Sequence, residues 1–309
     1  MVHAILTPAS WAFAAVTRWK RIYASPYRPR AKVVCLGNLT SGGTGKTPIA
    51  MAIANMLRAK SLRPTLLTRG YRGRLRGPII VDVMAHTASD TGDEAKLLAA
   101  AGRTIVARNR RRGAVLADSL ETDIIVMDDG YQNFTLKKDV AILVVDAETG
   151  FGNGRVLPVG PLREPISEGL ARADAVVLVG EGTPKLPGYA GPVFRVKLVP
   201  KGVQELAGKK LVAFAGIGRP EKFFATLKGL GAELVATNAF PDHHNFRMSE
   251  IAALKKKAKH EDAMLITTEK DFVRLAAQER EGIRILPIQA QFESQDAFEQ
   301  FLRAKLQLA

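Results

Sequence analysis

The sequence KVVCLGNLTSGGTGKTP occupies residues 32–48, where it joins an apolar run to a glycine-rich loop and then to a helical pattern. A strand, a loop and a helix in that order are the context that a phosphate-binding loop requires. Glycines let successive backbone N–H groups turn inward around phosphate oxygens, and the N-terminus of the helix adds partial positive charge. The stretch therefore predicts a site for the phosphates of a nucleotide.

Two side chains at the end of this loop are expected to meet the charge of the nucleotide. Lys46 would neutralise the β- and γ-phosphates, and the hydroxyl of Thr47 would bind Mg²⁺. The strict pattern has glycine where Thr40 stands, so the loop is a variant, and a coincidental glycine-rich turn is the alternative. The residues predicted to contact the nucleotide are Thr40, Ser41, Gly42, Gly43, Thr44, Gly45, Lys46 and Thr47.

Apolar runs alternate with helical patterns beyond the loop, and this alternation predicts the fold class. Strands joined by crossover helices favour an α/β fold with a doubly wound parallel sheet, like that of the P-loop NTPases. The expected strands of this first series lie at 32–36, 65–68, 104–107, 123–127, 140–145 and 175–179. Its expected helices lie at 47–60, 93–101 and 110–119.

A second alternating series follows a tract rich in proline and glycine at residues 181–192, which indicates a boundary. The series predicts a second, smaller α/β domain. Its expected strands lie at 211–215, 233–236, 263–267 and 283–287, and its expected helices at 221–229, 249–260 and 295–308.

The composition is that of a globular protein with a full core. The chain has 309 residues, of which 47% are hydrophobic and 24% charged, which fits one large or two ordinary domains. Disordered, collagen-like and disulfide-scaffold proteins are excluded. Cys35 is the single cysteine and cannot form an internal disulfide, which fits a reducing compartment. No run of about 18 apolar residues occurs, so no segment is expected to span a bilayer as a helix.

The net charge of +15 is concentrated in the first quarter of the chain. No Asp or Glu precedes Asp82, whereas residues 1–81 contain 14 Lys or Arg; the rest of the chain is nearly neutral. Such asymmetry indicates an anionic partner: nucleic acid, a phosphorylated substrate or an anionic membrane surface.

The N-terminal residues have the pattern of an amphipathic helix. Thr7 and Pro8 fit an N-cap followed by proline at the first helical position. Tryptophan with Lys and Arg on one helix is typical of a helix that lies at a membrane surface, and the order of charges does not fit a secretory signal. A helix that packs on the protein's own core is the alternative. The apolar face would carry Trp11, Ala15, Trp19, Ile22 and Tyr23, beside Arg18, Lys20 and Arg21.

A second motif, IIVMDDG at residues 124–130, ends an apolar strand in two carboxylates, Asp128 and Asp129. A carboxylate at such a strand end can reach the Mg²⁺ beside a phosphate-binding loop. Strands also end in Asp simply to form a turn. Two adjacent carboxylates are costly unless a cation neutralises them, and this favours a metal.

Two loops place arginine beside glycine. TRGYRGR at residues 68–74 contains Arg69 and Tyr71 and would present guanidiniums for phosphate at the rim of the sheet. A solvated basic loop is the alternative. Farther along, GPLREP at residues 160–165 contains an isolated pair, Arg163 and Glu164, after the weak pattern GFGNGR at residues 150–155.

Three further motifs contain acids and histidines. TGDEA at residues 91–95 places Asp93 at a helix start, where plain capping is the alternative. FPDHHNF at residues 240–246 puts two histidines beside an Asp, a contact that can orient an imidazole for acid–base work. A zinc site fails for lack of a third ligand, and a turn with incidental histidines is the alternative. TEKD at residues 268–271 does not match the guanine-reading pattern, so GTP is not inferred.

Together the motifs resemble the tetraacyldisaccharide 4′-kinase family, the lipid A 4′-kinases. The resemblance implies transfer of the ATP γ-phosphate to the 4′-hydroxyl of a tetraacylated disaccharide 1-phosphate lipid, which gives lipid IV-A at the cytoplasmic face of a Gram-negative inner membrane. It also implies two α/β/α domains, a two-stranded linker and an active site in the cleft. The matching blocks are residues 37–48, 68–73, 92–95, 128–133, 150–155, 160–165, 242–246 and 267–271.

The resemblance also assigns roles to residues. Lys46 and Thr47 match the phosphate and Mg²⁺ contacts, and at least one of Asp128 and Asp129 the metal ligand. Asp93 matches an acidic residue near the acceptor hydroxyl, a candidate general base. His243 would support it across the cleft, with His244 as the alternative. The expected catalytic residues are therefore Asp93, His243, Lys46, Asp128 and Asp129, and the expected substrate contacts are Arg69, Tyr71, Arg163 and Glu164.

The expected organisation has four parts. They are a membrane-associated helix over residues 1–30, a P-loop kinase domain over 31–188, a linker over 189–205 and a closing α/β domain over 206–309. The expected partners are ATP, Mg²⁺, the lipid substrate and the anionic inner-membrane surface, with no nucleic acid. The rival functions are a P-loop NTPase switch and a nucleic-acid-associated ATPase, but the sequence has no guanine or nucleic-acid motif and its second domain needs a purpose.

Overall fold

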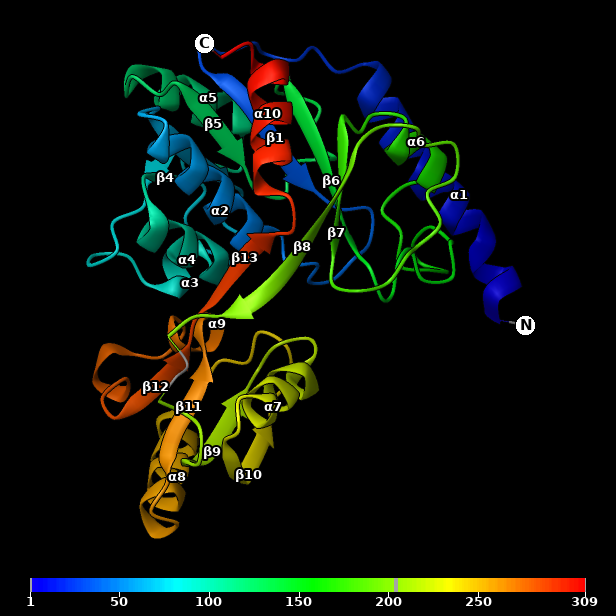
Figure 1. Ribbon diagram of the computed structural model, residues 1–309. Helices are drawn as coiled ribbons and strands as arrows, with labels where there is room; N and C mark the ends of the chain where they lie inside the picture. Colours follow the sequence, from blue (N-terminus) through cyan, green and yellow to red (C-terminus); the bar gives the residue numbers. More distant parts are fainter. Residues whose placement is uncertain (1, 203–204, 309) are drawn as a thin grey trace.

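The computed structural model describes residues 2–202 and 205–308, which contain two β-sheets (Figure 1). The larger has nine strands in the order β13-β8-β7-β6-β1-β5-β2-β4-β3, and the smaller four in the order β10-β9-β11-β12. The strands of the larger sheet are β1 (Lys32–Gly37), β2 (Pro64–Thr68), β3 (Ile79–Ile80), β4 (Thr104–Val106), β5 (Ile124–Met127), β6 (Val140–Asp146), β7 (Ala175–Val179), β8 (Val193–Pro200) and β13 (Ile288–Phe292). Those of the smaller sheet are β9 (Lys210–Ala215), β10 (Glu233–Ala239), β11 (Met264–Thr268) and β12 (Ile283–Leu286).

Helices cover both faces of the larger sheet, which explains why its central strands are apolar throughout. Alternate residues of β1 point to opposite faces: Val34 and Leu36 pack against α2, α4 and α10, whereas Val33 and Cys35 pack against α5. The helices around this sheet are α2 (Lys46–Ala59), α3 (Ala88–Thr91), α4 (Asp93–Ala101), α5 (Arg110–Ser119), α6 (Ile166–Leu170) and α10 (Gln295–Leu306).

The smaller sheet is all parallel and is also enclosed by helices. Helix α7 (Pro220–Gly229) packs on one face through Phe223 and Leu227, and α8 (Met248–His260) packs on the other through Ile251 and Leu254. Two short elements, α9 (Glu269–Phe272) and the 3₁₀ turn η1 (Ala277–Glu279), follow β11. The predicted α/β fold with a P-loop sheet and a second, smaller domain is confirmed.

The predicted domain boundaries need correction at the C-terminal end. Strand β13 pairs antiparallel with β8, and β8 pairs with β7, so both strands belong to the larger sheet and connect the two domains (Figure 1). Helix α10 buries Phe298, Leu302 and Leu306 against α2 and the larger sheet. The expected linker at 189–205 thus contains β8, a strand of the larger sheet. The second domain was expected to cover 206–309, but in the structure it ends before β13. An amphipathic helix packs wherever an apolar face is open to it, which pattern alone does not specify.

Helix α1 (Val2–Ile22) lies along the outside of the larger domain, beside α6 (Figure 1). Ser10 donates a hydrogen bond to the carbonyl of Val156 at 2.9 Å, and Arg21 pairs with Glu168 at 2.8 Å. Much of its apolar face remains exposed: Trp11 is 71% exposed and Trp19 60%.

Within residues 2–202 and 205–308, no helix combines the length and apolar character needed to cross a membrane.

The attachment of α10 to the larger domain can be tested by shortening Phe298. This side chain is fully buried and stacks on Phe292 of β13 with ring centres 4.2 Å apart. We expect Phe298→Ala to lower the free energy of unfolding by about 3–5 kcal/mol, measured by urea denaturation with circular dichroism. Val115→Ala, at a half-exposed position of α5, should change it by less than about 0.5 kcal/mol. Equal effects of the two changes would contradict the packing described here.

Candidate active site

The glycine-rich loop connects β1 to α2 at the carboxyl edge of the larger sheet. Gly45 precedes the helix with φ of 76°, in the left-handed region that glycine adopts most easily. A Cβ at this position would also lie 2.9 Å from Leu198 of β8. Ser41, Gly42 and Gly43 are exposed, whereas Lys46 and Thr47 are half-buried at the helix start. The loop therefore has the backbone form that a phosphate-binding loop needs, with its tip open to solvent.

The loop is held by the segment that contains Arg163. The backbone of Ser41 donates to the carbonyl of Pro161 at 2.7 Å, and that of Arg163 donates to Leu39 at 2.6 Å. Thr40 forms a β-bridge with Leu162. The GPLREP motif thus has a structural role that its sequence did not reveal, because it fixes one side of the glycine-rich loop.

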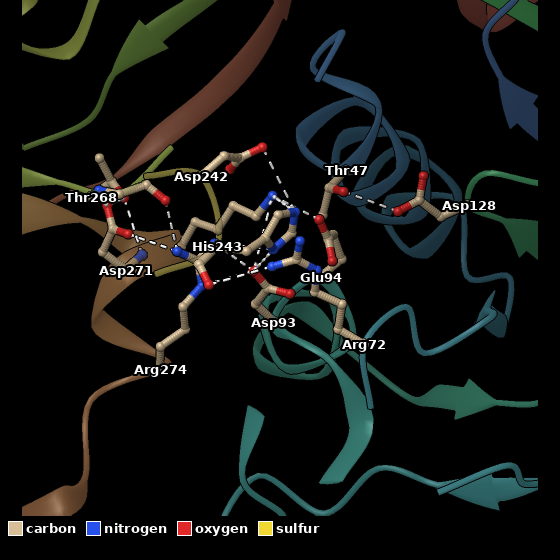
Figure 2. Close-up of polar contacts among 12 residues, drawn as sticks. Thr47, Arg72, Asp93, Glu94, Asp128, Asp242, His243, Thr268, Asp271 and Arg274 are labelled. Atoms are coloured by element: carbon tan, nitrogen blue, oxygen red, sulfur yellow. Dashed lines mark hydrogen bonds and ion pairs between the residues drawn. The ribbon is translucent and has the colours of Figure 1, made fainter. Parts of the chain in front are cut away.

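Asp128 directly follows β5 and lies beside the start of α2. Its Oδ2 accepts a hydrogen bond from the Thr47 hydroxyl at 3.0 Å (Figure 2). The carboxylate is 2% exposed, and its Oδ1 is buried without a hydrogen-bond partner. Burial raises the pKa of Asp128 to about 6. A buried carboxylate oxygen next to a threonine hydroxyl is a donor set that suits Mg²⁺.

Asp129 lies between two cations and is more exposed than Asp128. Lys46 Nζ is 3.4 Å from its Oδ1, and Arg163 Nη1 is 3.1 and 3.2 Å from its two oxygens. Partial burial alone would raise the pKa of Asp129, but Lys46 and Arg163 outweigh it and lower the pKa. Its φ of 52° is unusual for a residue other than glycine and is of a kind that clusters at functional sites.

The second domain contributes His243, whose ring faces Asp93 at the start of α4. His243 Nδ1 is 3.0 Å from Asp93 Oδ2, and Asp93 is 4% exposed (Figure 2). Burial alone would raise the pKa of Asp93, but the His243 hydrogen bond and the charges of Arg274 and Lys270 hold it well below its usual range. Asp93 is therefore ionised. The neighbouring His244 instead contacts Glu250 at 2.9 Å, so the geometry favours His243 as the partner of Asp93.

The remaining predicted substrate contacts differ in their surroundings. Arg69 and Tyr71 are exposed on the loop after β2, and the Tyr71 ring meets the His243 ring edge-on at 5.8 Å. Glu164 is 1% exposed; it pairs with Arg172 at 2.7 Å and accepts from Gln132 at 3.0 Å. These contacts make Glu164 a support for the loop that carries Arg163.

Sequence reasoning missed several cationic groups of the site. Lys270 Nζ is 2.8 Å from Glu94 Oε1 and 3.4 Å from His243 Nε2, and Arg274 binds Asp93. Asp93, Glu94 and His243 offer ligand atoms within 4.8 Å of one another, yet Lys270 and Arg274 already neutralise the two carboxylates, which disfavours a metal there. The sequence signal that could have located Lys270 and Arg274 was the TEKD motif at residues 268–271, which begins at the end of the parallel strand β11.

A glycine-rich phosphate loop with a buried carboxylate beside its helix, facing an Asp–His pair across two domains, defines a class of protein: the P-loop phosphotransferases. A family model described as Tetraacyldisaccharide-1-P 4'-kinase matches residues 2–307. The chain belongs to this family of lipid A biosynthesis kinases.

Similar proteins match over nearly the whole chain. A Tetraacyldisaccharide 4'-kinase from Rhodospirillum centenum is 47% identical over 307 residues, covering 98% of this chain and 91% of that protein. One from Methylorubrum extorquens is 46% identical over 308 residues, covering 97% and 93%. A crystal structure of LpxK from Aquifex aeolicus in complex with ATP aligns with a TM-score of 0.79 and 25% identity, covering 99% of this chain and 100% of that one.

The environment of Asp128 makes stability depend on pH. The pKa of Asp128 is about 6 in the folded protein and about 3.9 in the unfolded chain. The folded protein therefore binds this proton more tightly than the unfolded chain does. The free energy of unfolding is highest below about pH 4 and falls as the pH rises through about 6. We expect Asp128→Asn to be more stable than the wild type at pH 8, by on the order of 1–3 kcal/mol, and the difference to shrink at pH 5. Thermal unfolding at both pH values tests this, and a difference independent of pH would refute it.

Proposed function

We propose that the chain transfers the γ-phosphoryl group of ATP to the 4′-hydroxyl of a tetraacyldisaccharide 1-phosphate lipid, with the cleft between the two sheets as the active site. The observation that supports this most directly is the pairing of Asp93 with His243 opposite the glycine-rich loop, since hydrolysis alone would not require a second domain at the site. Family membership and the ATP bound in the Aquifex aeolicus neighbour agree with it.

In this proposal the glycine-rich loop binds the triphosphate. Phosphoryl transfer proceeds through a loose transition state, so positioning and charge neutralisation supply most of the catalysis. Lys46 contacts Asp129 in this structure and would instead contact the β- and γ-phosphates when the nucleotide binds. The backbone N–H groups at the start of α2 would face the same phosphates. Thr47 and Asp128 would hold Mg²⁺, because the free buried oxygen of Asp128 needs a cation. When bound, that ion would offset the charge of the phosphates.

Asp93 acts as the general base in the proposal. It is an ionised carboxylate with His243 at 3.0 Å, and it lies at the N-terminus of α4 next to the rim of the larger sheet. It accepts the proton of the acceptor hydroxyl while His243 holds it in place. Closure of the second domain would exclude water from the pair and limit wasteful hydrolysis of ATP.

Arg69, Tyr71 and Arg163 are proposed to contact the acceptor lipid. Arg69 and Tyr71 are exposed on the loop after β2, where the Tyr71 ring meets that of His243. Arg163 lies beside the phosphate loop and contacts Asp129. Guanidinium groups suit the phosphate of such a lipid. Glu164 would contribute indirectly, through its ion pair with Arg172.

We further propose that α1 places the enzyme on the cytoplasmic face of the inner membrane. Its exposed side chains include two tryptophans, and Lys20 and Arg21 follow them on the same helix. Aromatic rings and basic groups together favour the boundary of an anionic bilayer. A nucleic-acid surface would not expose so many apolar groups.

The phosphate loop and the base can be tested by transfer of labelled γ-phosphate from ATP to a disaccharide 1-phosphate lipid in mixed micelles. We expect Lys46→Ala to lower turnover by at least about 10²-fold, since charge stabilisation is lost, and Asp93→Ala by about 10²–10⁴-fold. Lys210→Ala, at an exposed position of β9, is the matched control and should leave turnover unchanged. Near-normal turnover of either site variant would overturn its assignment.

Membrane association can be tested by flotation with vesicles that contain anionic lipid. We expect Trp11→Ser combined with Trp19→Ser to reduce the floated fraction several-fold, because exposed aromatic area is removed from the membrane contact. Val115→Ser, another exposed apolar position, is the control. If the double variant floats like the wild type, α1 is not the anchor. Tight binding of an oligonucleotide over the same salt series would favour the nucleic-acid alternative.

A further inference from the structure

Arg274, which follows α9, reaches across from the second domain to the carboxylate of Asp93. Its Nη2 and Nε lie 2.5 and 2.9 Å from Asp93 Oδ2 (Figure 2). Both side chains are nearly buried, with 6% and 5% exposed. Removing one partner of a buried charge pair is far more costly than removing one at the surface, because the other charge is left buried without compensation.

The guanidinium is anchored on its own domain by a second set of bonds. Its Nη1 donates to Asp271 Oδ1 at 2.9 Å and to the carbonyl of Gly216 at 2.8 Å. Asp271 in turn accepts from the Gly216 N–H at 3.1 Å and from the Thr268 hydroxyl at 2.7 Å. With these contacts fixed to the ends of β9 and β11, the Arg274 fork is oriented before it meets Asp93.

The same carbonyl connects Arg274 to His243. Gly216 O also accepts from the backbone N–H of His243 at 3.0 Å, and His243 has a left-handed φ of 59°. A Cβ on Gly216 would stand 3.1 Å from Asp271 Oδ1, so the turn leaves little space for a side chain. The carbonyl of Gly216 therefore helps to position both Arg274 and His243, the two residues that hydrogen-bond to Asp93.

The cations from the second domain all approach one oxygen of Asp93. His243 Nδ1, Arg274 and, at 3.9 Å, Lys270 Nζ address Oδ2, and among the described residues none of these three groups is paired with Oδ1. This arrangement leaves Oδ1 for a hydroxyl. The charged or titratable groups around Asp93 are Glu94 on α4, Arg72 on the loop after β2, Asp242 and His243 on the loop after β10, Lys270 on α9, and Arg274.

We propose that Arg274 is a positioning residue for the transfer reaction, which on closure of the second domain keeps Asp93 ionised and turns its Oδ1 toward the acceptor hydroxyl. The proposal rests on the proposed role of Asp93 as the base. In this proposal Arg274, which is outside the Asp–His pair, orients Asp93 and keeps it ionised only when the cleft is closed. In the open enzyme Asp93 would lose this cation together with His243 and Lys270.

The rival explanation is that Arg274 merely holds the two domains together. A second charged contact across the cleft provides the comparison: Arg219, just before α7, pairs with Asp146 at the end of β6, and Lys222 pairs with Glu148. Arg219, like Arg274, is an arginine of the second domain bound to a carboxylate of the first, but its partners do not include Asp93. Arg219→Gln is therefore the matched control.

The test is the pH dependence of kcat for γ-phosphate transfer in Arg274→Gln, Arg274→Lys and Arg219→Gln, because kcat reports the enzyme with its substrates bound, in which the cleft is closed. We expect Arg274→Gln to lower kcat at least about tenfold with KM for ATP nearly unchanged. The acid limb of its pH profile should move to higher pH by about one unit or more, because loss of the neighbouring cation raises the pKa of the Asp93 carboxylate. Arg274→Lys should recover part of kcat and move the limb back. Arg219→Gln should leave the limb in place.

Two further measurements separate the explanations. The first repeats the comparison in a His243→Gln background by single turnover, where the imidazole is absent and the shift should persist. If Arg274→Gln is poorly folded by circular dichroism, Arg274→Lys serves for the profile, and millimolar guanidinium should restore activity to Arg274→Ala several-fold. An unchanged acid limb, or equal effects of Arg274→Gln and Arg219→Gln, overturns the proposal. Full activity of Asp93→Asn would instead refute the role of Asp93 itself.

Discussion

The hydrogen bond from Thr47 to Asp128 joins the first turn of α2 to the end of β5, and the rest of the site is arranged around it. Because β1 and β5 are parallel neighbours, the loop after one and the carboxylates after the other meet at the same edge of the sheet. Asp128 is buried there with one oxygen unpartnered. A buried carboxylate of this kind is costly for a folded protein, and the Mg²⁺ that we propose at this position would offset the cost.

Charge is divided between the two domains in a way that favours closure. Across the cleft, Asp93, Glu94, Asp146 and Glu148 belong to the larger domain, while His243, Lys270, Arg274, Arg219 and Lys222 belong to the smaller one. Attraction between opposite charges therefore brings the domains together at two separate places. One of these places includes the proposed base, so in our proposal closure of the second domain also positions the base.

The sequence predicted the site best where a single segment carries the signal. Lys46 and Thr47 begin α2 and Asp128 follows β5, as the local pattern predicted, and the structure brings Thr47 and Asp128 together. Their roles in binding stay a prediction. Arg274 was missed, since its partner Asp93 lies 181 residues away and only the packing of two domains brings them together. No strand was predicted at β13, and the whole chain from residue 206 onward was assigned to the second domain. The local pattern does not show that residues 288–308 return to the larger sheet.

The central claim is that the triphosphate binds where β1 meets α2, with the metal between Thr47 and Asp128. The most direct measurement is a crystal structure with a non-hydrolysable ATP analogue and Mn²⁺, whose anomalous signal locates the ion. The account requires the phosphates to lie against Lys46 and the anomalous peak to lie beside Asp128. An empty glycine-rich loop, with nucleotide and manganese bound elsewhere, would contradict it.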